Sequence, residues 1–223
     1  MINIITIERE YGCGGSEIAH LLAKQLGWKL WDQVLTEEIA RLAHCPKAVV
    51  EAREERPDPL YYRLFKSFLR GSFEGSLNAH KLNLVDSETI VRITKRVVQH
   101  AAEKGNSVIV GRGSQQFLKN RPDTLRVFLY ALREEKVRRL LARGKNQQEA
   151  EQLVDSVDQG RADFIRRYFH DVEWPDRAIY HTMMNTGIGD EAVVQMILST
   201  LKTYDARVTA SADVQGSLLG YGH

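Results

Sequence analysis

A glycine-rich turn near the N-terminus is the first segment whose residue types suggest chemistry. The turn, Gly12-Cys13-Gly14-Gly15, follows an apolar stretch at residues 2–7 and precedes apolar residues that recur at helical spacing. A strand–turn–helix junction of this kind places backbone N–H groups around an anion, and the helix N-terminus adds partial positive charge. We therefore expect a phosphate site here. The alternative is a junction that needs glycine only for its backbone angles.

The turn departs from the usual phosphate loop, G-x-x-x-x-G-K-[ST]. In the aligned stretch Arg9 takes the place of the first glycine, Gly15 stands where the lysine is expected, and Ser16 keeps the hydroxyl that contacts magnesium. Another cation must replace the missing lysine, and Arg9 is the nearest candidate in the sequence. Cys13 could have a lowered pKa at the helix start, but a small residue in a tight loop is the simpler interpretation.

Two charged residues directly follow apolar strand candidates. A charged side chain without a binding or structural role is unexpected at such a position. Asp32 ends a short strand candidate at residues 28–31, and Arg112 directly follows the apolar run at residues 108–110. Arginine suits phosphate binding because it presents a fixed fork of donors and a permanent charge. The alternative is a helix N-terminal charge for Asp32 and a structural salt bridge for Arg112.

A further group of arginines lies between residues 158 and 168. Positive groups around the transferred phosphoryl do most of the work in phosphoryl transfer, so Arg161 and Arg166 are candidates. At about 100° per residue they are offset by roughly 140° and cannot both face one ligand from a straight helix. Either the helix breaks at Gly160, or only one of them acts. We interpret Arg138 and Arg139 as part of a solvated, mixed-charge helix face.

The elements that must position these residues alternate between strands and helices. This alternation predicts an α/β fold with a parallel sheet covered on both faces, and ligands bind such sheets at the carboxyl ends of the strands. The region from 37 to 86 is interpreted as a helical insertion whose aromatic stripe packs on the core or forms a dimer face. The predicted strands and helices cover residues 2–7, 28–31, 108–110, 126–130 and 180–184, and 18–26, 36–43, 87–105, 134–143, 146–168 and 190–204.

The composition limits the classes of protein to consider. The chain has 223 residues, of which 43% are hydrophobic and 27% charged, enough for one domain with a sizeable core. The net charge of +2 gives no general attraction to nucleic acid or anionic membranes. No apolar run reaches the roughly 18 residues of a membrane span, and Cys13 and Cys45 match no disulfide scaffold or metal motif. We expect a cytoplasmic protein that binds neither nucleic acid nor membranes.

Taken together, the motifs resemble the cytidylate kinase-like family, a branch of the P-loop nucleoside monophosphate kinases. The resemblance rests on I-T-I-E-R-E-Y-G-C-G-G-S-E-I-A at 5–19, W-D at 31–32, V-I-V-G-R at 108–112, the arginine-rich stretch at 158–168, Tyr180 and N-T-G at 185–187. The order and spacing of these motifs are more specific than any one of them. In this branch the E-R-E-Y-G-x-G-G form replaces the lysine loop.

The resemblance implies a three-layer P-loop NTPase fold with a parallel sheet of about five strands. It implies a single kinase domain over residues 1–205, in which the core comprises 1–36 and 87–205. The helical insertion at about 37–86 would cover the acceptor, and a lid at about 145–170 would close over the phosphates. Residues 206–223 show little pattern and are expected to form a poorly ordered tail.

The implied activity is transfer of the ATP γ-phosphoryl group, with Mg²⁺, to a nucleoside monophosphate, CMP or dCMP. Arg9, Arg161 and Arg166 would be catalytic, Asp32 and Arg112 would bind the acceptor, and Ser16 would contact the metal. Two alternatives stay open: a nucleotide-binding sensor with little or no turnover, and a kinase for a non-nucleotide small molecule. If the aromatic stripe of the insertion is a dimer face rather than a core contact, a homodimer would form through it. The residues expected to hold the donor nucleotide are Gly12, Cys13, Gly14, Gly15, Ser16 and Glu17.

Overall fold

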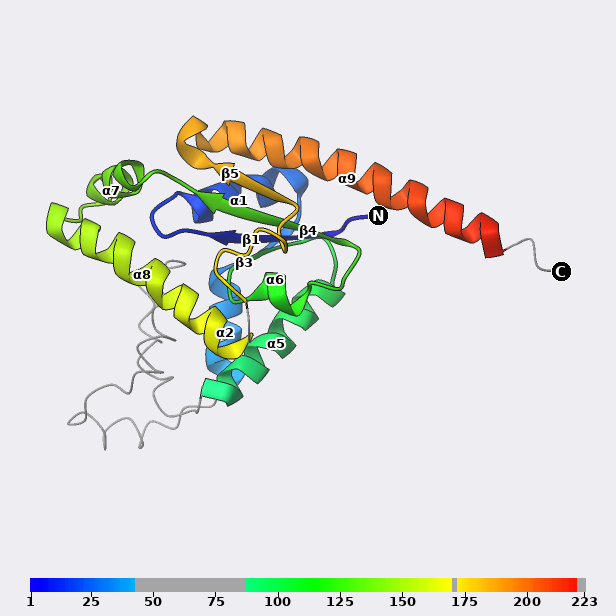
Figure 1. Ribbon diagram of the computed structural model, residues 1–223, viewed down its shortest axis with the longest axis horizontal. Coiled ribbons are helices and arrows are strands. Elements are labelled where there is room, and N and C mark those ends of the chain that lie inside the picture. The colour runs from blue at the N-terminus through cyan, green and yellow to red at the C-terminus, as the bar shows by residue number, and fades with distance from the viewer. Residues whose placement is uncertain (43–86, 170–171, 220–223) are drawn as a thin grey trace.

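A five-stranded parallel sheet forms the centre of the protein (Figure 1). The computed structural model describes residues 1–42, 87–169 and 172–219. Within them the strand order is β2-β3-β1-β4-β5, which confirms the predicted α/β class and parallel sheet. The strands are β1 (Ile4–Arg9), β2 (Lys29–Trp31), β3 (Ser107–Val110), β4 (Thr124–Tyr130) and β5 (Thr182–Asn185).

Strand β1 lies at the centre of the sheet and is buried on both faces. All six of its residues are buried, as expected for a strand that is covered on both sides of a parallel sheet. It pairs with β3 and β4, and the register places Ile7 beside Val110 and Arg9 beside Leu129. The segments that follow β1 and β3 therefore leave the sheet side by side, at its carboxyl edge.

Helices cover both faces of the sheet and form three layers (Figure 1). One face packs against α1 (Gly15–Leu26) and α9 (Asp190–Leu219). The other packs against α2 (Gln33–Leu42), α5 (Ser87–Glu103) and the C-terminal end of α8 (Gln147–Tyr168), with the short α6 (Ser114–Phe117) beneath them. Beyond the carboxyl edge, α7 (Arg133–Ala142) and α8 pack against each other, and a 3₁₀ turn, η2 (Thr186–Ile188), leads into α9.

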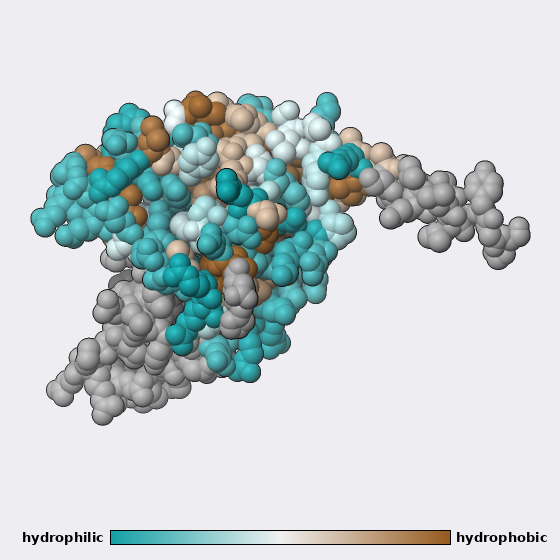
Figure 2. Space-filling model, viewed as in Figure 1, coloured by the Kyte–Doolittle hydropathy of each residue, from teal (hydrophilic) through white to brown (hydrophobic). Residues whose placement is uncertain are grey.

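Helix α8 runs without a break where the sequence suggested that a lid could hinge. It begins at Gln147, after Asn146 accepts a hydrogen bond from the Glu149 N–H at 2.8 Å, which confirms the predicted helix start. It continues through Gly160 to Tyr168. Its outer surface and that of α7 are mostly hydrophilic (Figure 2), because their apolar faces turn inward.

Two helix boundaries differ from the predicted ones. Helix α2 begins at Gln33, directly after Asp32, so Thr36 lies within its first turns and does not cap it. Helix α9 does not end at Tyr204 but continues to Leu219, where a poorly ordered tail was expected. Residues 205–219 lack proline and contain three alanines, so helix propensity persists after the apolar pattern stops. The expected insertion begins within α2, and its remainder from 43 to 86, with the expected dimer face, lies outside the described residues.

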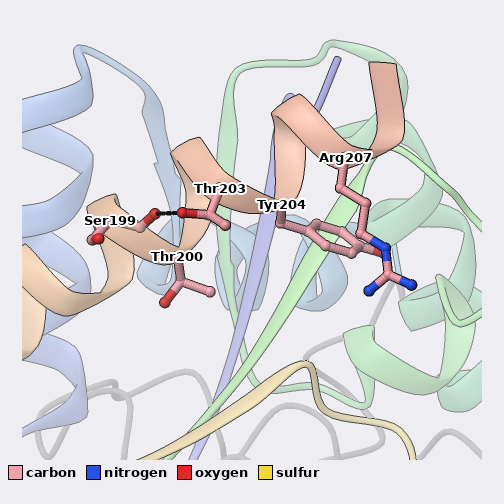
Figure 3. Close-up of a pocket in the computed structure, with 5 residues that line it drawn as sticks. All are labelled: Ser199, Thr200, Thr203, Tyr204 and Arg207. Atoms are coloured by element: carbon pink, nitrogen blue, oxygen red, sulfur yellow. Dashed lines mark hydrogen bonds between the residues drawn. The ribbon is translucent and has the colours of Figure 1, made fainter. Parts of the chain in front are cut away.

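Helix α9 is anchored to the sheet through a half-buried histidine. His181 Nδ1 accepts the Arg126 N–H at 3.0 Å, and Nε2 lies 2.8 Å from the Arg126 guanidinium and 3.1 Å from the Tyr204 hydroxyl. On the outer side of Tyr204 a pocket of about 350 Å³ runs along α9 (Figure 3). The pocket is lined by Ser199, Thr200, Thr203, Tyr204 and Arg207.

Among the helices that the structure describes, none combines the length and the apolar character of a membrane span.

This anchor predicts a loss of stability in mild acid. Burial, and then the nearby Arg126, lower the pKa of His181 from 6.5 to about 4. Between these pH values His181 is protonated in the unfolded chain but stays neutral in the folded protein. The free energy of unfolding therefore decreases as the pH falls through this window. The slope of the free energy of unfolding against pH reports the number of protons taken up on unfolding. We expect His181→Asn to reduce that number by up to one.

Urea unfolding at pH 7, 6, 5 and 4.5 measures the slope. His20→Asn is the matched control, because His20 is exposed on α1. Equal slopes for the wild type and His181→Asn would show that this histidine does not titrate on unfolding.

Candidate active site

The glycine turn forms a tight loop between β1 and α1. Gly12 and Gly14 have φ angles of 80° and 86°, in the left-handed region that side chains other than glycine rarely adopt. Gly14 precedes the first turn of α1, and its carbonyl accepts the Ile18 N–H at 3.1 Å. The loop therefore brings residues 12–16 to the positive end of a twelve-residue helix, which is the setting of an anion site. Glu17 is exposed and pairs with Arg143.

Arg9 fills the space beneath this loop. Its side chain is 3% exposed, and a Cβ at Gly15 would lie 2.8 Å from its Cγ and 2.9 Å from its Cβ. A Cβ at Gly111 would overlap its guanidinium. Position 15, where the usual loop has lysine, thus has no room for a side chain while Arg9 is present. The guanidinium points toward two carboxylates, at 3.8 Å from Glu8 and 4.0 Å from Asp32.

Ser16 and Asp32 bring two oxygen atoms together beside Arg9. The Ser16 hydroxyl donates to the Asp32 carboxylate at 3.1 Å. Adjacent ligands of octahedral Mg²⁺ lie about 3 Å apart, since each metal–oxygen bond is about 2.1 Å. The pair therefore fits a magnesium ion that keeps several waters. In the part of the chain that the structure describes, no three carboxylate, histidine or cysteine side chains are grouped to hold a metal ion, so phosphate oxygens would complete the shell.

Arg112 is held in a strained and buried position after β3. Its φ angle is 60°, and those of its neighbours Gly111 and Gly113 are 64° and 65°. A residue other than glycine in this region costs about 1–3 kcal/mol, and such residues cluster at functional sites. Burial, and then the nearby Arg9, lower the pKa of Arg112 to about 9, while Asp32 acts in the opposite direction. An anion beside this guanidinium would stabilise its charged form.

The arrangement separates the two arginines that were expected on the lid. Arg161 is buried and donates to the carbonyl of Arg9 at 2.7 Å, so it belongs to the loop region. Arg166 lies on another face of α8, is exposed, and pairs with Asp163 on its own helix. The structure thus brings Arg9, Arg112 and Arg161 into one cluster and leaves Arg166 outside it.

The loop cysteine is unsuited to redox chemistry. Cys13 is fully buried, its Sγ lies 3.7 Å from the Leu129 carbonyl, and burial raises the pKa of its thiol to about 12. The desolvation outweighs the helix N-terminus, which would lower that pKa. The thiol therefore stays protonated at neutral pH. This favours its interpretation as a small residue in a tight loop.

The interpretation of α7 as a solvated face was wrong for Arg139. Arg138 is exposed and pairs with Glu135, but Arg139 is mostly buried and donates to both oxygens of Asp190, at 2.7 and 3.3 Å. Its guanidinium also lies directly against Gly14. Helical spacing groups Arg139 with Lys136, three residues earlier, which also faces the loop, but the spacing alone does not indicate that this face is buried.

The solved structure of one other protein supports the fold, and two kinases align more loosely. An uncharacterized protein from Eubacterium ventriosum aligns with a TM-score of 0.64 and 22% identity, over 91% of this chain and 99% of its own. Shikimate kinases from Bacteroides thetaiotaomicron and Acinetobacter baumannii align with TM-scores of 0.49 and 0.48 and identities of 17% and 16%. Each covers 91% of this chain, and 99% and 94% of the respective kinase.

Sequence comparisons settle the family. No curated protein matches the chain. The model of the cytidylate kinase-like family matches residues 4–188, a range that includes the glycine turn, Asp32, Arg112 and Arg161. The chain therefore belongs to the cytidylate kinase-like family.

Proposed function

We propose that this protein transfers the γ-phosphoryl group of ATP to a nucleoside monophosphate, CMP or dCMP. Membership of a P-loop kinase family supports the use of ATP and Mg²⁺ in general. The observation that carries the proposal is the cluster of buried arginines, Arg9, Arg112 and Arg161, beside a glycine turn at the carboxyl edge of the sheet. Phosphoryl transfer needs positive charge around spreading negative charge, and this cluster supplies it.

On the donor side, the loop amides of residues 12–16 and the N-terminus of α1 would bind the β- and γ-phosphates. Arg9 would supply the charge that a lysine provides in the usual loop. Ser16 and Asp32 would hold Mg²⁺, which neutralises phosphate charge when it is bound. Asp32 would also orient Arg9, from which it lies 4.0 Å away. Arg139, against Gly14, adds a cation on the outer side of the same loop.

On the acceptor side, Arg112 would bind the phosphate of the monophosphate. Its guanidinium can present two parallel donors to phosphate oxygens. A phosphate acceptor is already a nucleophile, so the reaction needs no general base. In this arrangement Arg166 is exposed on another face of α8, so no step requires it.

A coupled assay of ADP release tests the function directly. With ATP and Mg²⁺, we expect release of ADP when CMP or dCMP is added, and not with ATP alone. Release of ADP with another monophosphate only, or with a hydroxyl-bearing compound, would identify that compound as the acceptor in place of CMP or dCMP. Thermal stabilisation by ATP, about 2.7 kcal/mol at 100 times its Kd, without ADP release from any acceptor, would identify a binding protein without turnover.

Replacing Arg112 by alanine tests the acceptor side. Its expected partner, the acceptor phosphate, is present in both the ground state and the transition state. The KM for the monophosphate should therefore rise about ten-fold or more, with a smaller decrease in kcat. Arg138→Ala is the matched control, because Arg138 is exposed on α7. An unchanged KM in Arg112→Ala would remove this residue from the acceptor site.

A further inference from the structure

A chain of alternating charges joins the phosphate loop to α7 and α8. Lys136 on α7 donates to Glu10 of the loop at 3.0 Å and to Asp158 on α8 at 3.4 Å. Asp158 also pairs with Arg161 at 3.2 Å, and Arg161 donates to the carbonyl of Arg9. The network has two positive and two negative side chains, and such pairing is what allows charges to be buried.

The network holds the loop backbone as well as its side chains. The Tyr11 N–H donates to the Asp158 carboxylate at 2.8 Å, so this amide points toward α8. Gly12 packs directly on α7, since a Cβ there would lie 3.2 Å from both the Cβ and the carbonyl oxygen of Lys136. The last residue of β1, Arg9, and the first three residues of the loop, 10 to 12, are therefore each held by Lys136, Asp158 or Arg161.

Position 15 contributes no side chain that could hold the loop from within. We infer that α7 and α8 act as a latch, defined as Lys136, Asp158 and Arg161, which fixes the loop in the shape that binds the ATP phosphates. Asp158 is its central positioning residue, because it contacts the loop backbone, Lys136 and Arg161. The effect on ATP rests on the proposed function, whereas the effect on the loop does not.

The latch gives Arg161 a structural task. Its guanidinium binds a main-chain carbonyl at the end of β1 and a carboxylate one turn away on α8. A lid arginine would have to leave these partners in order to close over the phosphates. In the latch it keeps them, and it acts on the nucleotide through the loop.

Variants of Asp158 separate the latch from general packing of α7 and α8. Asp158→Ala removes the acceptor of the Tyr11 N–H, whereas Asp158→Asn keeps an oxygen for that N–H but loses the charge and the oxygen that accepts from Lys136. Asp155→Ala is the matched control: it breaks another carboxylate–cation pair between the two helices, with Arg133 at 3.0 Å, which is exposed. Lys136→Met serves if Asp158→Ala does not fold, because it keeps the stem that contacts Gly12.

Two readouts are measured on samples that are fully folded by their melting curves. Hydrogen exchange of residues 9–14 without nucleotide should speed up about ten-fold in Asp158→Ala, be partly rescued in Asp158→Asn, and stay unchanged in Asp155→Ala. The Kd for MgATP, measured by calorimetry, should rise about ten-fold in Asp158→Ala, rise less in Asp158→Asn, and stay unchanged in Asp155→Ala.

The outcomes distinguish the latch from the proposed function. Unchanged exchange and affinity in Asp158→Ala, or equal losses in Asp155→Ala, would overturn the latch. If the wild type binds no ATP, the proposed function fails, and the exchange of residues 9–14 still decides whether the latch exists.

Discussion

Burial of arginine at the carboxyl edge of the sheet is the constraint on which the rest of the site depends. A guanidinium removed from water is costly unless carboxylates, carbonyls or an anion surround it. Here Arg9 lies beside Glu8 and Asp32, and Arg161 binds a carbonyl and Asp158. Burial and Arg9 lower the pKa of Arg112, so a phosphate there would stabilise its charged form. The proposed function uses this cluster of buried arginines as its phosphate site.

The same constraint explains the glycines around the cluster. Gly15 and Gly111 leave room for the side chain of Arg9, and the left-handed turn at residues 111–113 places Arg112 beside it. The usual phosphate loop has glycine at the position of Arg9 and lysine at the position of Gly15. The two differences are linked, because Arg9 occupies the space that a side chain at position 15 would need. Helices α7 and α8 contact the loop elsewhere, at Glu10, Tyr11 and Gly12.

The sequence was sufficient for features that depend on local patterns, and insufficient for those set by docking. The spacing of apolar residues and the glycine turns predicted the strands and most helices. The positions of Arg112 and Asp32 at the ends of apolar strands indicated that they are candidate site residues. Mixed charge on α7 concealed Lys136 and Arg139, because only the packing of α7 against the loop decides which of its faces is buried. The roles of Arg161 and Arg166 likewise could not be separated until α8 was seen to be unbroken. The length of α9 was missed because helix propensity, without an apolar stripe, leaves no periodic signal.

Exchanging the two positions tests most directly whether Arg9 replaces the loop lysine. We expect turnover per folded molecule to fall about 10³-fold, roughly 4 kcal/mol, in Arg9→Gly, because a transition-state cation is lost. Gly15→Lys should also lose activity, since its side chain would collide with Arg9. The double variant Arg9→Gly/Gly15→Lys should recover at least ten-fold over Arg9→Gly. Turnover of Arg9→Gly within a few-fold of the wild type, or a double variant no better than Arg9→Gly, would contradict the account.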